Sequence, residues 1–443
     1  MLFHFLKYIK PVWYFNLRQR NGKVAFPDPD TLPPEVLGCC QKYNYEGEYA
    51  VAADLAWQAL QKGYVGESGF PYFGTKHSLK DEYTFIRNYF KGVWAWYILF
   101  IRVFTLHNPL KEISAFYKTK NIRCTNVFKE PYLYKTWKNF ESELVKKQPK
   151  VSVVIPTLNR YEYLRDVLKD LESQDYTNFD VIIVDQSEPY NEGFYKNFNL
   201  DIKLLRQKEK ALWQARNSAI QKSDAPWLLL FDDDSRVKKN WITQHLQCVD
   251  FFEASVSSGV SISKIGDEVP ENYSYFRISD QLDTGNVLIN RKVFEAIGLF
   301  DRQFEKQRMG DGAFGLRVYL EGFLNISNPF AGRLHLKVAS GGLRQMGSWD
   351  AFRPTNWWAP RPVPSVLYYY RLYFGNQMAR MALLQSLPRS VVPYQFKKDK
   401  KWLPFAILSA LIAAPLLLLQ AQRSWLLATK KLKEGPLIGK LKN

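Results

Sequence analysis

Three consecutive aspartates, Asp232, Asp233 and Asp234, follow the five apolar residues 227–231 in a chain of 443 residues with a formal net charge of +18. While the backbone stays extended, side chains two residues apart share a face. Asp232 and Asp234 are therefore expected to point the same way, and Asp233 the opposite way. Two carboxylates on one side offer the oxygen ligands that Mg²⁺ and Mn²⁺ prefer. The sequence predicts a divalent-cation site able to hold a diphosphate; a solvated acidic turn is the alternative.

A fourth acid, Asp185, ends another apolar run, residues 180–185. In an open α/β sheet, ligands bind at the carboxyl ends of the strands, where loops can reach them. Because both runs are expected to be strands of one sheet, Asp185 and the three aspartates should lie on the same edge. A plain surface acid is the alternative for Asp185.

Alternating strand-like and helix-like segments after residue 150 would position these acids. The predicted strands are 151–155, 180–185, 202–205 and 227–231. Apolar residues recur at positions i, i+3, i+4 and i+7 from Leu164 to Leu171, which is typical of an amphipathic helix. A second helix is expected over 211–223. This alternation predicts an α/β fold with a mostly parallel central sheet.

Four ordered segments resemble the family 2 glycosyltransferases, enzymes with the nucleotide-sugar-binding GT-A fold. The first is "VSVVIPTLNRYEYLRDVLKDLESQDYTNFDVIIVDQS", and "KALWQARNSAIQKSDAPWLLLFDDDSRV" leads into the aspartates. The segments "TGNVLINRKVFEAIGLFDRQF" and "GDGAFGLRVYLEGF" resemble the acceptor-side and catalytic-base segments of that family. The resemblance covers roughly residues 151–345, and an ordered series of four is far more specific than any one member.

Carried over position by position, the resemblance implies a donor site. Thr157 and Asn159 would lie beside the nucleoside, Asp185 would hydrogen-bond the base, and Arg216 would lie near the nucleotide. Asp232 and Asp233 would belong to the nucleotide-sugar site, with Asp232 reaching the ribose or the metal. The donor would be a UDP-, dTDP- or GDP-linked sugar. The alternatives are a turn cap for Thr157 and Asn159 and a surface salt bridge for Arg216.

The resemblance also implies a metal site and a sugar site. Asp234 would ligate Mg²⁺ or Mn²⁺ directly, and His335 would supply a third metal or phosphate contact. Asp283 and the backbone of Gly285 and Asn286 would lie near the sugar. A tight turn over 283–286 and a simply packed histidine are the alternatives.

Asp311 would be the general base of an inverting transfer to a hydroxyl of a glycan or lipid-linked acceptor. It precedes a helical pattern, so an N-cap acid is the alternative. The family commonly carries Glu just before this base, whereas this chain has Gly310. Gln420, Arg423 and Trp425 only approximate the motif of processive synthases, so the resemblance implies transfer of one hexosyl or deoxyhexosyl unit per encounter.

Three regions are expected: an N-terminal accessory region over 1–150, a catalytic domain over 151–345 and a basic C-terminal region over 346–443. From residue 333 onward, eighteen Lys and Arg face three acids, so +15 of the net charge of +18 lies there. The apolar segment 402–422 lies between lysines, and basic flanks prefer the cytoplasmic side. We expect peripheral or monotopic attachment to the cytoplasmic face of the cell membrane; a buried helical hairpin is the alternative.

The four cysteines show no metal-binding spacing and are expected to be reduced thiols. Because basic and apolar residues coincide at the C-terminal end, lipid is a better partner than nucleic acid, and no nucleic acid is expected. The composite prediction is a metal-assisted enzyme of polysaccharide or cell-envelope biosynthesis. A non-catalytic basic adaptor that binds membrane or nucleic acid, and a nucleotidyltransferase with the same metal site, are the alternatives.

Overall fold

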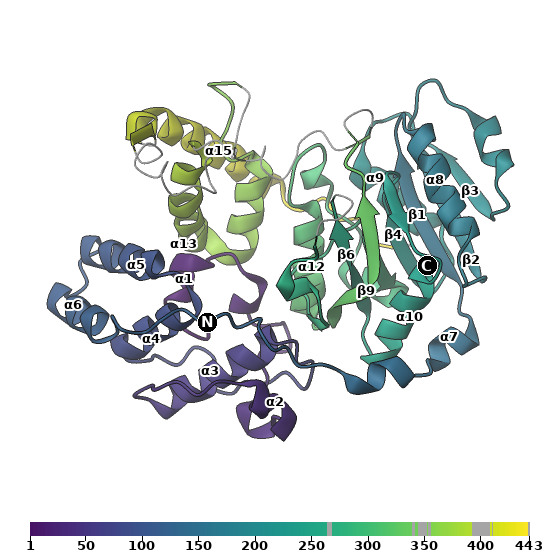
Figure 1. Ribbon diagram of the computed structural model, residues 1–443. Coiled ribbons are helices and arrows are strands. Elements are labelled where there is room, and N and C mark those ends of the chain that lie inside the picture. Colours follow the sequence, from purple (N-terminus) through teal and green to yellow (C-terminus); the bar gives the residue numbers. More distant parts are fainter. Residues whose placement is uncertain are drawn as a thin grey trace.

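The computed structural model describes residues 1–263, 268–338, 342–343, 352, 356–391, 408–409 and 411–441. One half of the molecule is a twisted sheet flanked by helices, and the other half is a group of helices built from both ends of the chain (Figure 1). The predicted α/β class, with helical regions before and after the sheet domain in the sequence, is confirmed.

The sheet runs in the order β3-β2-β1-β4-β8-β6-β9-β5, with β7 paired to β9. Its strands are β1 Val151–Thr157, β2 Phe179–Asp185, β3 Ile202–Arg206, β4 Trp227–Phe231, β5 Ser235–Val237, β6 Val256–Ile262, β7 Arg277–Ile278, β8 Asn286–Asn290 and β9 Asn325–His335. The half β3-β2-β1-β4 is parallel throughout, while β8 runs antiparallel to both of its neighbours. The parallel half therefore brings the carboxyl ends of β1, β2 and β4 to one edge.

Alternate residues of β1 enter two different cores, because successive side chains of a strand point to opposite faces. Val153 and Ile155 pack with α8 (Tyr161–Glu172) and α10 (Trp241–Phe251). Val154 lies in a second core with α9 (Leu212–Lys222), α11 (Arg291–Ile297) and α12 (Gly310–Glu321). All seven residues of β1 are buried, as expected for a strand covered on both faces.

The N-terminal region is helical and shares the second core with the sheet domain. Its helices are α1 Leu6–Ile9, α2 Pro34–Cys39, α3 Glu48–Gln61, α4 Leu79–Tyr89, α5 Gly92–Phe104, α6 Pro109–Lys118 and α7 Glu143–Lys147. Several hydrogen bonds connect it to α12: the Tyr14 hydroxyl donates to the Gly312 carbonyl, the Tyr319 hydroxyl donates to the Leu17 carbonyl at 2.8 Å, and the Arg20 N–H donates to the Leu320 carbonyl at 2.7 Å. This region therefore packs directly on the element that carries Asp311.

The C-terminal region contains α13 (Pro364–Val391), broken at Gly375, and α15 (Ala414–Glu434). These two helices pack together, and the chain then returns to the sheet domain, where Asp301 and Ile438 form a bridge. Within the expected segment 402–422, residues 402–407 and 410 lie outside the described residues. Among the described residues, none of the helices has the length and apolar character needed to cross a membrane.

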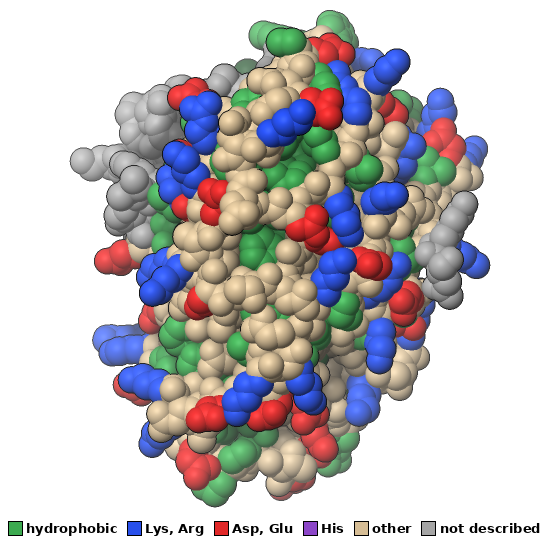
Figure 2. All heavy atoms as spheres, turned by 90° about the vertical axis from the view of Figure 1, so that its right-hand side faces the viewer, with side chains coloured by type: hydrophobic (Ala, Val, Ile, Leu, Met, Phe, Trp, Pro, Cys, Tyr) green, Lys and Arg blue, Asp and Glu red, His purple; other side chains and the backbone are tan. Residues whose placement is uncertain are grey.

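The face shown in Figure 2, on the α8 and β3 side of the molecule, carries Lys and Arg interspersed with Asp and Glu. Apolar side chains appear between them as small separate areas. The catalytic domain therefore presents a mixed-charge surface on this side, which agrees with a charge excess concentrated elsewhere in the chain.

Candidate active site

Asp232, Asp234 and His335 come together at the carboxyl edge of the sheet. Each offers one ligand atom, and these three atoms lie within 4.8 Å of one another. The antiparallel pairing of β5 with β9 explains the histidine, because Ser235 lies opposite His335 and Asp234 directly precedes that pair. His335 Nε2 is 3.3 Å from an oxygen of Asp234. Two carboxylates and an imidazole suit a divalent cation, so the chemistry of this set fits the predicted metal.

Asp232 is held between two arginines from different elements. Arg216 of α9 donates to one carboxylate oxygen at 2.8 Å, and Arg333 of β9 donates to the other, also at 2.8 Å. Both guanidinium groups are buried. Because each carboxylate oxygen has two lone pairs, Asp232 can accept these bonds and still contribute to a metal site. The arginines offset part of the repulsion among the aspartates.

Asp233 is almost completely buried and is not one of the three clustered ligands. It accepts a hydrogen bond from the Thr157 hydroxyl at 2.8 Å and one from Arg160 at 2.9 Å. Arg160 also donates to Asp234 at 3.1 Å, so it bridges two of the three aspartates. The structure therefore places Thr157 and Asp233 beneath the site, where they fix the loop that carries the ligands.

The electrostatic environments of these carboxyls differ. Burial raises the pKa of Asp233 to about 6, although Arg160 opposes the shift. Burial alone would also raise the pKa of Asp234, but the hydrogen bond from His335 and the charges of His335 and Arg160 leave it below its usual value. A carboxyl that loses its proton readily suits metal ligation, because a ligand must be deprotonated to bind.

The segment 283–286 forms a tight turn against Arg333. The Asp283 carboxylate accepts from Arg333 at 2.8 Å, from Ser261 at 2.8 Å and from the Gly285 N–H at 3.1 Å. Burial would raise the pKa of Asp283, but Arg333 outweighs it and lowers that pKa. A Cβ added at Gly285 would lie closer than 3.0 Å to atoms of Asp232 and Arg333, so glycine is required for this approach. The turn 283–286 is therefore in direct contact with the side chain of Asp232, one of the three clustered ligands.

The Asn286 side chain is fully occupied inside the protein. It accepts from Trp241 at 2.8 Å and shares a hydrogen bond of 3.1 Å with His245. It donates to the carbonyls of Val260 and Ala331 at 3.0 and 2.9 Å. All of its side-chain hydrogen-bonding capacity is used, so Asn286 fixes the start of β8, and its side chain has nothing left to offer a sugar.

Asp185 lies on the predicted edge, but its carboxylate is also satisfied internally. Tyr161 and Tyr195 donate to one oxygen at 2.7 and 2.8 Å, and the Ser187 N–H donates to the other at 2.8 Å. Its exposed fraction is 0%. Asn159 has a positive φ of 54° and its side chain accepts from the Glu188 N–H, which joins the loop after β1 to the loop after β2. A nucleobase could reach the Asp185 carboxylate only if Tyr161 and Tyr195 moved away; otherwise it would contact the two tyrosines instead.

Asp311 lies in the first turn of α12, where its carboxylate accepts from the Gly312 N–H at 3.0 Å. Gly310 stands where the family commonly has Glu, and the reason is steric. A Cβ at Gly310 would lie closer than 3.0 Å to the ring of Trp213. Trp213 is held by a 3.2 Å bond to the Phe304 carbonyl. The indole therefore fills the space that the family's Glu side chain would need.

Four contributors to this site were absent from the sequence expectations: Arg333, Arg160, Trp213 and the tyrosine pair. Arg333 had a usable signal, because it is two residues before His335 and so shares its strand face. Arg160 immediately follows the loop after β1, on the edge already predicted. Nothing in the sequence pattern signalled Trp213, because its role depends on the approach of two helices.

Comparison with known proteins agrees with this geometry. Residues 152–320 match the model of glycosyl transferase family 2. Glycosyltransferase GlyA of Streptococcus pneumoniae is 22% identical over 167 residues, which cover 36% of this chain and 22% of that protein. The poly(ribitol-phosphate) β-N-acetylglucosaminyltransferase TarS of Staphylococcus aureus is 26% identical over 114 residues, 24% of this chain and 20% of that protein. The chain thus spans about a fifth of the length of these two relatives.

Among solved structures, a mannosyltransferase from Pyrobaculum calidifontis in complex with GDP-Man and Mn²⁺ is 14% identical. The match covers 68% of this chain and 93% of that chain, with a TM-score of 0.44. The resemblance expected from the four sequence segments is confirmed by the family model, which begins in β1 and ends in α12. Residues 152–320 of this chain therefore constitute a family 2 glycosyltransferase domain.

Proposed function

We propose that the chain is an inverting, metal-dependent glycosyltransferase that moves a sugar from a nucleoside diphosphate to a hydroxyl of a glycan or lipid-linked acceptor. The observation that carries the proposal is the cluster of Asp232, Asp234 and His335 at the carboxyl edge of a family 2 domain. These three side chains would hold the cation. When bound, the metal would neutralise charge on the diphosphate as it leaves.

The ligand set favours Mn²⁺ over Mg²⁺. Mg²⁺ prefers oxygen ligands, whereas His335 contributes a nitrogen. Arg160 lies against Asp233 and Asp234 and holds the metal loop in place. Arg216 and Arg333 orient Asp232 and add positive charge next to the metal site. This positive charge suits an anionic donor.

Asp311 is proposed as the general base. A single carboxylate on the side opposite the leaving diphosphate would accept the proton of the acceptor hydroxyl, and direct displacement would invert the anomeric carbon. Packing of Trp213 on Gly310 fixes the start of α12 and so fixes the position of Asp311.

The experiment is a screen of UDP-, dTDP- and GDP-sugars with Mn²⁺, in which the released nucleotide is identified. Release of nucleoside diphosphate that EDTA abolishes supports the proposal, and the anomeric configuration of the product tests inversion. Asp311→Asn should lose transfer yet still bind nucleoside diphosphate, while the exposed Asp201→Asn serves as the matched control. Release of pyrophosphate would instead identify a nucleotidyltransferase, and full activity of Asp311→Asn would remove the assigned base.

We also propose that the chain works at the cytoplasmic face of the cell membrane, held there by an apolar surface with basic flanks. The surface is formed by the outer side chains of α5, α6 and their connection: Val93, Trp96, Phe100, Phe104, Leu106, Leu110, Ile113 and Tyr117. Phe104 and Leu106 are 81% and 95% exposed. A contiguous exposed apolar area of this kind marks an interaction site, and Trp and Tyr suit the membrane interface.

Charge supports a membrane as the occupant of this surface. Lys111 and Lys118 lie on α6, Lys91 directly precedes α5 and Lys120 follows α6, and the C-terminal region carries most of the net positive charge. Each Lys or Arg near an anionic leaflet contributes about 1 kcal/mol of binding free energy.

The wild-type chain should sediment with vesicles that contain phosphatidylserine and less with neutral vesicles. The pair Trp96→Ser and Phe104→Ser should lose this binding, whereas Leu133→Ser, an exposed leucine outside the surface, should retain it. Equal binding by all variants would refute the assignment.

A further inference from the structure

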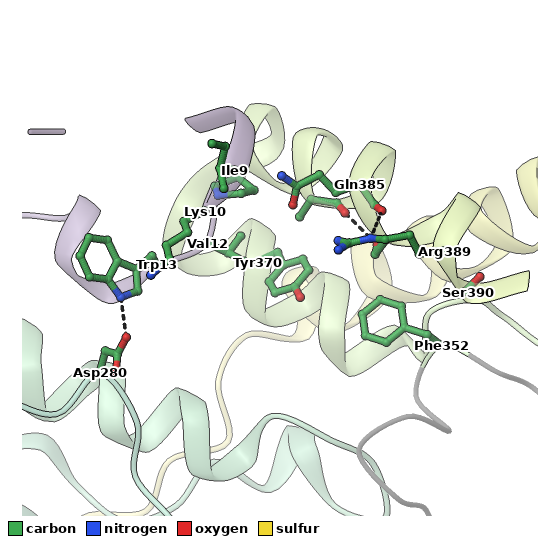
Figure 3. A pocket seen from close by; sticks show the side chains of 13 residues that line it. Ile9, Lys10, Val12, Trp13, Asp280, Phe352, Tyr370, Gln385, Arg389 and Ser390 are labelled. Atoms are coloured by element: carbon green, nitrogen blue, oxygen red, sulfur yellow. Dashed lines mark hydrogen bonds between the residues drawn. The ribbon is translucent and has the colours of Figure 1, made fainter. Parts of the chain in front are cut away.

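A pocket of about 600 Å³ lies between the N-terminal segment and α13, outside the metal site (Figure 3). Lys10, Trp13 and Asp280 lie toward one end, Phe352 and Arg389 toward the other, with Tyr370 between them. Ligand-binding pockets typically have volumes of about 300–1,000 Å³. This one is therefore large enough for a sugar residue or a short glycan segment.

The two cations of the pocket have spare hydrogen-bonding capacity. Among the described residues, the Lys10 ammonium makes no hydrogen bond or ion pair, and it lies 4.7 Å from the Trp13 ring centre and 5.7 Å from that of Trp57. Burial lowers the pKa of Lys10, with Asp280 opposing the shift. Arg389 is exposed, and within the described part of the chain its guanidinium donates one hydrogen bond, from Nε to the Gln385 carbonyl at 2.7 Å. Both groups are available to a ligand.

The one acid of the pocket is already partnered. Asp280 accepts from the Trp13 indole N–H at 2.6 Å, and its other oxygen lies 3.4 Å from Arg277. Because these neighbours offset the charge of Asp280, Lys10 and Arg389 leave the pocket with a positive excess. The rings of Trp13, Phe352 and Tyr370 add apolar surface next to that charge.

The pocket adjoins the two segments that the proposed transfer uses. Tyr14, next to Trp13 in sequence, donates to the Gly312 carbonyl in the helix turn that carries Asp311. Asp280 lies three residues before Asp283, whose carboxylate binds Arg333 of the metal site. Through Trp13 and Asp280 the lining of the pocket is thus connected to the helix that carries Asp311 and to the turn 283–286, while most lining residues lie outside the family match at 152–320.

We propose that this pocket binds the acceptor, and that the acceptor residue held there is a sugar carrying an acidic group, a carboxylate or a phosphate. The proposal rests on the glycosyltransferase function above and names its acceptor class. Flat aromatic rings pack against the C–H faces of a pyranose, and Trp13, Phe352 and Tyr370 supply such rings. The hydrogen bond that Arg389 donates uses only its Nε, so its two terminal nitrogens pair with the acid, and a charge-assisted hydrogen bond is about twice as strong as a neutral one. Lys10, toward the opposite end of the pocket, adds positive charge there.

The test is calorimetric titration of the full chain with D-glucuronic acid, D-glucose 6-phosphate, D-glucose and inorganic phosphate. The acidic sugars should bind at least about tenfold more tightly than glucose and than phosphate alone, and the stronger of the two distinguishes carboxylate from phosphate. Arg389→Gln should weaken the binding of the acidic sugars about fivefold or more, and Lys10→Gln should weaken it to a smaller extent. Arg380→Gln, an exposed arginine on the same helix outside the pocket, is the matched control and should change nothing.

Equal affinity for glucose and the acidic sugars would overturn the assignment of charge. Binding of inorganic phosphate as tight as that of glucose 6-phosphate would overturn the assignment of a sugar. An Arg389→Gln variant that behaves like Arg380→Gln would move the site elsewhere. Mn²⁺ titration and donor turnover are followed in parallel, because a chain that binds acidic sugars but transfers nothing refutes the proposed function and leaves the pocket assignment standing.

Discussion

Replacing Gly310 with alanine tests whether the Trp213 ring fixes the start of the base helix. The added methyl group would lie closer than 3.0 Å to three atoms of that ring, and the indole cannot withdraw without losing its 3.2 Å bond to the Phe304 carbonyl. Forcing an extra methyl group into a well-packed contact typically costs about 1–3 kcal/mol. Gly310→Ala should therefore lower the free energy of unfolding by that amount and reduce turnover, because the first turn of α12 carries Asp311.

Gly312 provides the matched control in the same turn. A Cβ there would have Met309 Cε as its nearest neighbour at 3.7 Å, which is ordinary van der Waals contact. Alanine is favoured over glycine in a helix by up to about 1 kcal/mol, so Gly312→Ala should be neutral or stabilising. Both variants replace glycine with alanine in the first turn of α12. The difference between their free energies of unfolding therefore measures the effect of the clash with Trp213.

Denaturant unfolding followed by circular dichroism measures both variants, and donor turnover with Mn²⁺ measures the effect on the site. Combining Gly310→Ala with Trp213→Phe, which removes part of the indole, should recover at least about 1 kcal/mol relative to the sum of the single changes. Stability of Gly310→Ala equal to that of Gly312→Ala, or strictly additive effects in the double variant, would refute the steric explanation.

Three further predictions concern the metal site and its support. Asp234→Asn should weaken Mn²⁺ binding at least about tenfold in calorimetry, because even supporting residues typically contribute that much; an unchanged affinity would remove Asp234 from the ligand set. Gly285→Ala should weaken Mn²⁺ binding as well, since its Cβ would displace the Asp232 carboxylate; Gly69→Ala, where a Cβ meets open space, is the control. Burial lowers the pKa of His245 to about 4. As the pH falls from 6.5 toward 4, the imidazole therefore gains a proton in the unfolded chain but not in the folded one, and the free energy of unfolding should decrease. The loss from this group is about 2 kcal/mol between pH 7 and pH 5; His245→Gln should lack this component, and an identical pH profile would contradict the assignment.

The sequence predicted the parallel half of the sheet well, because its strands are buried on both faces and read as uninterrupted apolar runs. It also predicted that Asp232 and Asp234 would approach a common point, although the backbone there is not extended as expected, because residues 233–234 form a turn between β4 and β5. It could not show that Asp185 and Asn286 would be satisfied inside the protein. Their partners, such as Tyr195 and Trp241, come from separate segments and meet only when the chain is folded.

The helical half was harder to predict for a different reason. Apolar periodicity shows that a helix has one buried face but does not identify what covers it. The run 92–100 lies in α5, which has one buried and one exposed side: Ala95 and Ile98 are buried, while Trp96 and Phe100 are exposed. For the C-terminal region, charge composition alone could not show that α15 packs on α13, because that contact depends on shape.

Asp301 joins three distant parts of the chain. It accepts from the Tyr368 hydroxyl of α13 at 3.0 Å and from the Leu437 N–H at 2.9 Å. Close by, the Leu299 N–H donates to the Gly439 carbonyl at 2.8 Å. The segment that follows α15 is thus attached to the sheet domain at the same carboxylate that holds α13. A substitution that removes the Asp301 carboxylate would therefore loosen two separate attachments of the C-terminal region at once.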